Sequence, residues 1–302
     1  MSRILVTGGT TFVSRFTAAF FRDEGYEVFV LNRNSKPQEE GVTLIEGDRH
    51  DLGGRLKDMT FDAVLDITAY NGNDVSDLLS GIKDFGTYIL LSSSAVYPED
   101  EKQPFAEECV RRENRYWGRY GTDKIEAEDK ALKLAPDAYI LRPPYLYGPM
   151  DNLYREAFVF DCARDDRKFY LPREGEMKLQ FFHVRDLCKI MRYIIENKPE
   201  DHILNVGNPD PVTVREWVTL CYACMGKTPE FVNVTAPVEQ RKYFSFYDYE
   251  YVLDVRRQSR ILAEVTDLKE GLEESLDWYK KNESEVRKKP LIRFIDEELM
   301  PG

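Results

Sequence analysis

The stretch R-I-L-V-T-G-G-T-T-F-V-S, Arg3–Ser14, contains a short apolar run, a glycine turn and the start of a helical pattern. The run at 3–6 is typical of a buried strand. From Phe12 to Glu24 the apolar side chains recur at helical spacing, and Gly25 closes the segment as a C-terminal glycine does. A helix N-terminus that follows a strand and a glycine turn binds anions readily. The stretch therefore predicts a phosphate-binding loop at the start of an α/β fold.

Dinucleotide-binding loops carry three spaced glycines, and this loop keeps only the first of them. Gly8 meets the need for a tight turn, whereas Thr11 and Ser14 stand where the second and third glycines would be. Neither substitution removes the backbone N–H donors, and either hydroxyl can donate to a phosphate oxygen. From the loop alone two interpretations stay open, a modified phosphate cradle and a plain strand–helix turn.

The same alternation of strand and helix continues through the first half of the chain. Further apolar strand patterns occupy 27–31, 42–46, 61–67, 87–91 and 138–142, with helical patterns at 75–82 and near 116–134. Strands rich in Val, Ile and Leu with helical crossovers predict a parallel sheet that is covered on both faces. Right-handed crossovers then give a doubly wound sheet of the Rossmann type.

After the Pro-rich segment at 143–149 the alternation loosens, although 203–207 is again strand-like and 214–225 is again helical. We expect two domains. A dinucleotide-binding Rossmann domain would cover 1–143 and be joined again by about 182–207. A smaller C-terminal α/β domain for the substrate would comprise 144–181 and 208–302, packed on the carboxyl edge of the sheet, where ligands bind in such folds.

The composition of the 302 residues is that of an ordinary globular protein, with 42% hydrophobic and 32% charged residues. A net charge of −12 argues against nucleic acid or an anionic membrane as the main partner, because phosphate binding needs clustered positive charge. The first apolar run is too short for a signal peptide, so we expect a cytoplasmic protein. The five cysteines are then reduced thiols, and Cys221 and Cys224 belong to an apolar helix. The three histidines lack metal-ligand spacing, so no metal site is expected.

Two further motifs carry chemistry. The strand at 87–91 ends in S-S-S-A-V-Y-P, 92–98, and Y-G-T-D-K follows at 120–124. Tyr120 and Lys124 lie four residues apart, on one face of the predicted helix. An ammonium beside a phenol lowers the pKa of the phenol, which makes Tyr120 usable as an acid or base. A serine hydroxyl at the strand end can bind the same substrate oxygen.

With these motifs the sequence resembles the extended short-chain dehydrogenase/reductases, the NAD-dependent epimerase/dehydratase group. The resemblance extends over nearly the whole chain and includes T-G-G-T (7–10), S-S-S-A-V-Y (92–97), the Tyr120–Lys124 motif, L-R-P-P-Y-L-Y-G-P (141–149), F-F-H-V-R-D-L (181–187) and N-V-G-N (205–208). It implies an NAD(P)-dependent oxidoreductase, epimerase (an isomerase) or dehydratase. The reaction would be a Tyr-assisted hydride transfer at a carbinol of a sugar or sugar nucleotide. It also implies a homodimer.

The resemblance assigns roles residue by residue. Tyr120 would be the general acid/base, Lys124 would hold the nicotinamide ribose, and Ser93 would steady the substrate oxygen. The implied cofactor contacts are Gly8, Thr10, Thr11, Phe12, Val13, Asn32, Arg33, Asp48, Arg49, Ile67, Thr68, Ala69, Ser92, Tyr120, Lys124 and Pro143. The implied substrate contacts are Ser94, Tyr145, Gln180 and Arg241.

The chain departs from the family pattern at two more places. Asn32 and Arg33 follow the second strand where an Asp for the adenosine ribose is usual, and an Arg there suits the 2′-phosphate of NADP. Both NAD and NADP therefore remain candidates. Gln180 stands where members acting on nucleotide-diphosphate sugars commonly have an Arg, with Lys178 or Arg241 as replacements for it.

The alternative function is a catalytically weak or inactive relative that binds a nucleotide or RNA. The altered loop favours it, whereas the acidic charge and the retained Ser–Tyr–Lys set oppose it. The C-terminal R-K-K-P, 287–290, is interpreted as a solvated turn.

Overall fold

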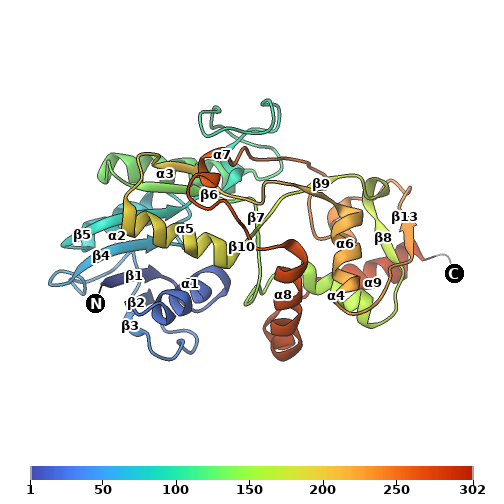
Figure 1. The fold of residues 1–302 in the computed structure, drawn as a ribbon, viewed down its shortest axis with the longest axis horizontal. Helices are drawn as coiled ribbons and strands as arrows, with labels where there is room; N and C mark the ends of the chain where they lie inside the picture. Colours follow the sequence, from blue (N-terminus) through green and yellow to red (C-terminus); the bar gives the residue numbers. More distant parts are fainter. Residues whose placement is uncertain (1, 301–302) are drawn as a thin grey trace.

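A computed structural model describes residues 2–300. Its centre is a seven-stranded sheet, all parallel, with the strand order β11-β6-β5-β4-β1-β2-β3 (Figure 1). The strands are β1 (Arg3–Thr7), β2 (Glu27–Asn32), β3 (Thr43–Glu46), β4 (Thr60–Asp66), β5 (Asp84–Leu91), β6 (Tyr139–Arg142) and β11 (Ile203–Asn205). The predicted doubly wound Rossmann-type α/β fold is confirmed.

Helices cover both faces of the sheet, as parallel strands with crossover connections require. On one face α1 (Phe12–Asp23) packs beside α5 (Val184–Asn197), and the two helices and the strands beneath them form one apolar cluster. On the other face α2 (Gly72–Gly81) and α3 (Arg119–Leu134) form a second cluster with the sheet. Helix α3 starts later than the predicted 116, because 115–118 form a turn that ends at Gly118 with φ +50°.

A second lobe, seen opposite the sheet in Figure 1, is built from short strands and helices with their own core. Its strands are β7 (Tyr145–Tyr147), β8 (Phe169–Leu171), β9 (Lys178–Leu179), β10 (Phe181–His183), β12 (Val212–Thr213) and β13 (Phe231–Asn233). Its helices are α4 (Glu156–Arg164), α6 (Val214–Ala223), α8 (Leu268–Asn282) and α9 (Leu291–Phe294). Helix α7 (Arg256–Ser259) instead packs beside β11 of the sheet. Along the chain, short 3-10 or π turns cover 94–96, 172–175, 240–242, 283–285 and 295–299.

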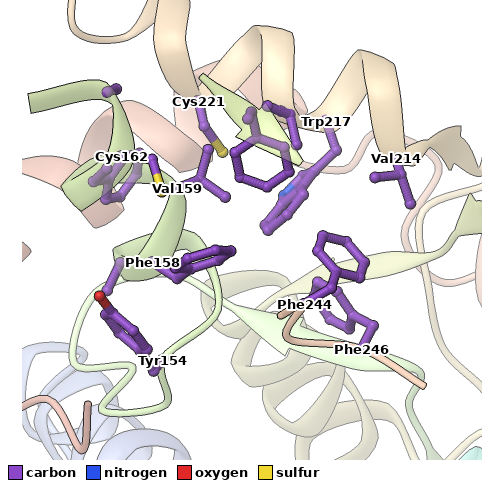
Figure 2. Packing of buried hydrophobic residues seen from close by; sticks show 14 of the residues in the cluster. Tyr154, Phe158, Val159, Cys162, Val214, Trp217, Cys221, Phe244 and Phe246 are labelled. Carbon is purple, nitrogen blue, oxygen red and sulfur yellow. The ribbon is translucent and has the colours of Figure 1, made fainter. Parts of the chain in front are cut away.

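Aromatic side chains fill the core of this lobe. Figure 2 shows Trp217 of α6 above Phe244 and Phe246, with Phe158 of α4 to the left of these three residues. Trp217 lies 5.3 Å from Phe246 between ring centroids, at an interplanar angle of 80° that suits the ring quadrupoles. This packing supports the loops that carry residues 153–155 and 241–247. These loops form part of the wall of the second cavity described below.

The five cysteines are free thiols, and three of them are buried. Cys221 of the C-x-x-C pair is fully buried in the aromatic core beside Trp217 (Figure 2), and burial raises the pKa of its thiol well above the usual range. Within residues 2–300 no group of three His, Cys, Asp or Glu side chains is placed to hold a metal ion. None of the helices described is long and apolar enough to cross a membrane.

Candidate functional site

The opening loop is a cradle made by two adjacent glycines. Gly8 and Gly9 adopt φ +93° and +94°, a region that side chains other than glycine rarely adopt. A Cβ on Gly8 would lie 2.7 Å from the Ser14 hydroxyl oxygen, and one on Gly9 would lie 2.6 Å from Val30 Cγ1. The turn therefore depends on both residues, although sequence reasoning credited only Gly8.

Thr11 and Ser14, which replace the missing glycines, are accommodated in different ways. Ser14 is buried against Gly8, and its hydroxyl donates to the Thr11 carbonyl at 3.0 Å. Thr11 is the N-cap residue of α1, but its side chain makes no capping hydrogen bond. The first amides of α1 therefore lack a side-chain acceptor at the point where the helix meets the cavity. This arrangement fits a bound pyrophosphate, because it leaves donors and the positive end of the helix dipole for an anion.

The first cavity, about 450 Å³, extends from this cradle along the carboxyl edge of β1, β2 and β4. Predicted cofactor contacts that line it are Gly8, Thr10, Thr11, Asn32, Arg33, Asp48, Arg49 and Thr68. Two of its basic side chains are closely paired with carboxylates. The Arg49 guanidinium binds Asp66 at 2.9 Å and the Thr68 hydroxyl at 2.8 Å, and His50 lies between Asp74 and Asp77.

The end of β2 holds the residues that bear on the choice between NAD and NADP. The Asn32 amide donates to the Gly8 carbonyl at 2.6 Å and to the Gln38 side chain at 2.9 Å, so it braces the loop. The Arg33 side chain is 78% exposed and reaches Asp48 only at 4.0 Å. Lys36 lines the same cavity. Two cations are thus available beside the position where an adenosine ribose would lie.

The second cavity, also about 450 Å³, contains Ser93 and Tyr120. Ser93 follows β5, and its hydroxyl oxygen accepts a hydrogen bond from the Ala95 amide at 3.2 Å. Tyr120 lies in the first turn of α3, which packs so closely on the Ser93 loop that a Cβ on Gly121 would lie 2.4 Å from the Ala95 carbonyl oxygen. Local packing thereby fixes the two hydroxyls on one wall.

Lys124 lies one turn further along α3 and is buried. Its ammonium donates to the carbonyl oxygens of Ala69 and Leu91, both at 2.7 Å. Burial lowers the pKa of Lys124 to about 8, and the nearby Asp66 and Glu128 carboxylates only partly oppose that shift. Two of the three N–H bonds of the ammonium are thus used by backbone carbonyls.

The pKa of Tyr120 differs from the expectation. The residue is 39% exposed, yet desolvation by the surrounding protein raises the pKa of its phenol, and a hydrogen bond with Ser93 opposes this only in part. Sequence reasoning expected Lys124 to lower it. The Lys124 ammonium is instead 5.9 Å from the Tyr120 ring centroid and is directed to two carbonyl oxygens.

Of the other residues predicted to contact cofactor or substrate, some line a cavity and others are packed in the interior beneath it. Ser94, Tyr145 and Arg241 line the second cavity. Residues that support the site from the interior are Phe12, Val13, Ile67, Ala69, Ser92 and Pro143. Gln180 lines neither cavity: its buried amide donates to the Asn208 carbonyl at 2.9 Å and accepts from the Leu253 amide at 2.8 Å. The structure therefore places Gln180 away from the predicted substrate contact. Its side-chain amide is hydrogen-bonded to backbone groups and has a structural role.

Several residues of the cavity walls were not predicted from the sequence, and four of them bear on the chemistry. Tyr70 is exposed on the first cavity, with its ring centroid 6.4 Å from that of Tyr120. Arg155 and Lys289 line the second cavity, and Arg287 lines both. Two of them belong to the R-K-K-P that was interpreted as a solvated turn, and nothing in that short motif indicates a cavity.

The sequence is similar to a known protein family and to individual proteins of other organisms. The family described as the NAD dependent epimerase/dehydratase family matches residues 4–207. Chloroplast stem-loop binding protein of 41 kDa b from Arabidopsis thaliana is 27% identical over 300 residues, covering 90% of this chain and 78% of that protein. Methionine adenosyltransferase 2 subunit beta from Bos taurus is 22% identical, covering 66% of this chain and 64% of that protein.

Two solved structures share the fold. That of dTDP-glucose 4,6-dehydratase from Bacillus anthracis, in complex with NAD, superposes with a TM-score of 0.76 at 20% identity, over 96% of this chain and all of that one. That of UDP-glucose 4-epimerase from Thermotoga maritima, with UDP-glucose, gives a TM-score of 0.74 at 19% identity, over 92% of this chain and 99% of that one.

Proposed function

This chain belongs to the NAD dependent epimerase/dehydratase family, and we propose that it transfers hydride between a nicotinamide dinucleotide and a carbinol carbon of a sugar-like substrate. One observation carries the proposal: Ser93 and Tyr120 line the same cavity, and Lys124 lies one turn after Tyr120 on helix α3. The loops of 144–181 and 208–302 supply most of the other walls, so we propose that these segments form the substrate-binding domain.

The cofactor would lie in the first cavity. The Gly8–Thr11 cradle would hold its pyrophosphate, Arg33 and Asp48 would lie beside the adenosine, and the free N–H of Lys124 would bind the nicotinamide ribose. When bound, the nicotinamide supplies the hydride donor or acceptor. This chain's own residues orient the substrate and handle the proton.

Tyr120 is the proton donor in the reducing direction. Because its pKa lies above the usual value, the phenol stays protonated near neutral pH and can give its proton to a substrate carbonyl oxygen as that oxygen gains charge. Ser93 holds the same oxygen by a second hydrogen bond. In the oxidising direction Tyr120 must take up the proton, and the Ser93 hydroxyl and the positive charge of Arg155 favour the phenolate that this requires.

The decisive experiment identifies the cofactor without a known substrate. Purified protein is denatured and any released dinucleotide is identified by mass spectrometry. Thermal unfolding is then measured with added NAD and NADP. We expect one of them to be released or to raise the melting temperature, since a ligand that binds only the folded state stabilises it. No released dinucleotide and no shift with either would refute the proposal.

RNA binding is a second candidate, favoured by the 27% identity to a chloroplast stem-loop binding protein. Against it stand the net charge of −12 and the retained Ser93, Tyr120 and Lys124. A gel-shift titration with a stem-loop RNA at low and moderate salt tests it. Binding that weakens steeply with salt would support this function, because neutralised phosphates release counterions.

A further inference from the structure

The two cavities meet at one side chain. Among residues 2–300, Arg287 is the one residue that lines both of them. The other residues that line the first cavity all come from the stretch between Gly8 and Asp74, within the first lobe. Arg287 instead belongs to the segment 283–289 that follows α8, hereafter the strap. A residue of the second lobe therefore borders the cavity proposed for the cofactor.

The strap is anchored in the second lobe on both sides of Arg287. Val286, the residue before it, is buried in the aromatic core of that lobe. The Lys288 ammonium, after it, lies 2.8 Å from Asp161, a buried carboxylate of α4. The Arg287 amide itself donates to the Asn152 carbonyl at 2.9 Å. These contacts fix the backbone from which the Arg287 side chain extends.

The strap also contacts the first lobe, at the start of α1. The Arg15 guanidinium donates to the Glu285 carboxylate at 2.9 Å. Arg15 lies in the first turn of α1, and its amide donates to the Thr11 carbonyl at 3.3 Å, so this turn is the one that adjoins the glycine cradle. Two residues of chain span at most about 7 Å. Arg287 therefore lies within that distance, along the backbone, of an ion pair at the edge of the cradle.

The Arg287 guanidinium has no protein partner of its own. Within residues 2–300 no carboxylate oxygen lies within 4.0 Å of it, and its side chain makes no hydrogen bond. The other arginines of the first cavity are placed differently: Arg49 is bound to Asp66, and Arg33 follows β2, at the adenosine end. The donors of Arg287 are therefore available to an anion in the cradle.

We propose that Arg287 binds the pyrophosphate of the dinucleotide from the second lobe, so that the strap and the glycine cradle hold the cofactor between the two lobes. The planar guanidinium suits this role, because it can donate two parallel hydrogen bonds to phosphate oxygens. The inference rests on the proposed function, since the pyrophosphate must lie in the Gly8–Thr11 cradle. Binding and strap ordering are then linked, so a bound dinucleotide also steadies the strap.

The first measurement is the affinity for ADP-ribose, NAD, NADP and UDP-glucose, by calorimetry at constant ionic strength. ADP-ribose shares the pyrophosphate with NAD and NADP but lacks the nicotinamide and the 2′-phosphate. Arg287→Ala should weaken the binding of all three about tenfold, because each loses a charged hydrogen bond. Arg287→Lys keeps the charge without the paired donors, so its loss should be smaller.

Arg215→Ala is the matched control for these variants. Within residues 2–300 Arg215 also has no carboxylate within 4.0 Å, but it donates to the Glu174 carbonyl and lines neither large cavity. It should bind every ligand like the wild type. The unliganded melting temperature of Arg287→Ala should equal that of the wild type, because its side chain has no partner to lose, so weaker binding is not a failure to fold.

The second measurement is hydrogen exchange of the strap, followed by mass spectrometry. The dinucleotide that the wild type binds more tightly is added to saturation. It should slow exchange in residues 283–289 of the wild type, because Arg287, held by the pyrophosphate, keeps its amide on the Asn152 carbonyl. In Arg287→Ala the dinucleotide should still protect the cradle, residues 7–15, but no longer the strap.

The proposal is overturned if Arg287→Ala binds ADP-ribose as tightly as Arg215→Ala does, or if the dinucleotide leaves exchange of the strap unchanged. A loss confined to NADP would overturn it by assigning Arg287 to the 2′-phosphate, and a loss confined to UDP-glucose by assigning it to the second cavity. Failure of the proposed function looks different. A wild type that binds no dinucleotide removes both, whereas dinucleotide binding that is unchanged in Arg287→Ala removes only the role of the strap.

Discussion

The two cavities have the same volume but treat charge in opposite ways. In the first, Arg49 is bound to Asp66 and His50 lies between two aspartates, so these two basic side chains are paired within the protein. In the second, Arg155 and Arg241 have no carboxylate partner among residues 2–300. The first cavity therefore offers a ligand a backbone cradle beside paired charges, and the second offers it hydroxyls beside cations without carboxylate partners. Substitutions in each cavity should therefore differ in their effects on ligand binding and turnover.

The largest effect is expected from removing the phenol that we propose as the proton donor in the second cavity. Tyr120→Phe keeps the ring but removes the hydroxyl, so turnover should fall by about 10²- to 10⁴-fold, the usual contribution of general acid–base catalysis. The assay follows nicotinamide absorbance with a panel of sugar phosphates and sugar nucleotides, using any that the wild type converts. Dinucleotide binding, measured by thermal shift, should change little because the cradle is distant in sequence and intact.

Ser93→Ala is the companion variant for this prediction. It removes a hydrogen bond but no proton donor, so it should reduce turnover less than Tyr120→Phe. Equal turnover of wild type and Tyr120→Phe would show that the second cavity does not use this phenol, and the comparison would then rest on binding alone.

Lys124 sharpens the comparison because its charge belongs to neither cavity and is held by two carbonyl oxygens. Its pKa is lowered to about 8 from 10.5. Between these values the folded protein has lost the proton that the unfolded chain still binds, so this residue's contribution to stability rises with pH across the window. The free energy of unfolding of the wild type, relative to Lys124→Met, should therefore increase by about 3 kcal/mol from pH 8 to pH 10.5.

Urea unfolding of both proteins across this range measures that difference, and other titrating groups cancel because the two proteins share them. A constant difference from pH 8 to pH 10.5 would mean that the Lys124 ammonium keeps its ordinary pKa. It would then be as solvated as the cations of the second cavity, contrary to its burial.

The residues of the two cavities were not equally predictable from sequence. The sheet, the Ser93 loop and the Tyr120–Lys124 spacing follow from local patterns of strand, turn and helix. Arg287 and Lys289 do not, because their position depends on pairing between the segment after α8 and residues 152–153, far away in the chain. Gln180 was misjudged for a related reason: its partners, Asn208 and Leu253, come from other segments.

The pKa of Tyr120 was misjudged for a different reason. Helical spacing places Lys124 on the same face, but spacing does not tell where an ammonium on a flexible chain points. Here two carbonyl oxygens compete for it. Desolvation, which no sequence motif reports, then decides the direction of the shift.

A smaller effect is expected at the weakest ion pair of the first cavity. Arg33 reaches Asp48 only at 4.0 Å and is mostly exposed, so its charge is available to a 2′-phosphate. Arg33→Ala should weaken NADP binding about tenfold and leave NAD binding nearly unchanged. Calorimetric titration of both dinucleotides measures the ratio. An equal loss for both would mean that Arg33 contacts the shared adenosine, and Lys36→Ala would then be the variant to test for the 2′-phosphate.

The smallest effect concerns the residue that made the opening loop unusual. Thr11→Gly removes a side chain that lines the first cavity and makes no capping hydrogen bond, so the folded protein should lose only a few tenths of a kcal/mol. If recognition here is by backbone amides, closer approach of the pyrophosphate should raise dinucleotide affinity about two- to threefold. Ser14→Gly is the contrast, because Ser14 is packed against Gly8 and bound to the Thr11 carbonyl. It should lower stability more and raise affinity less. A fall in affinity with Thr11→Gly would instead identify the Thr11 hydroxyl as a phosphate ligand, and the first cavity would then share side-chain recognition with the second.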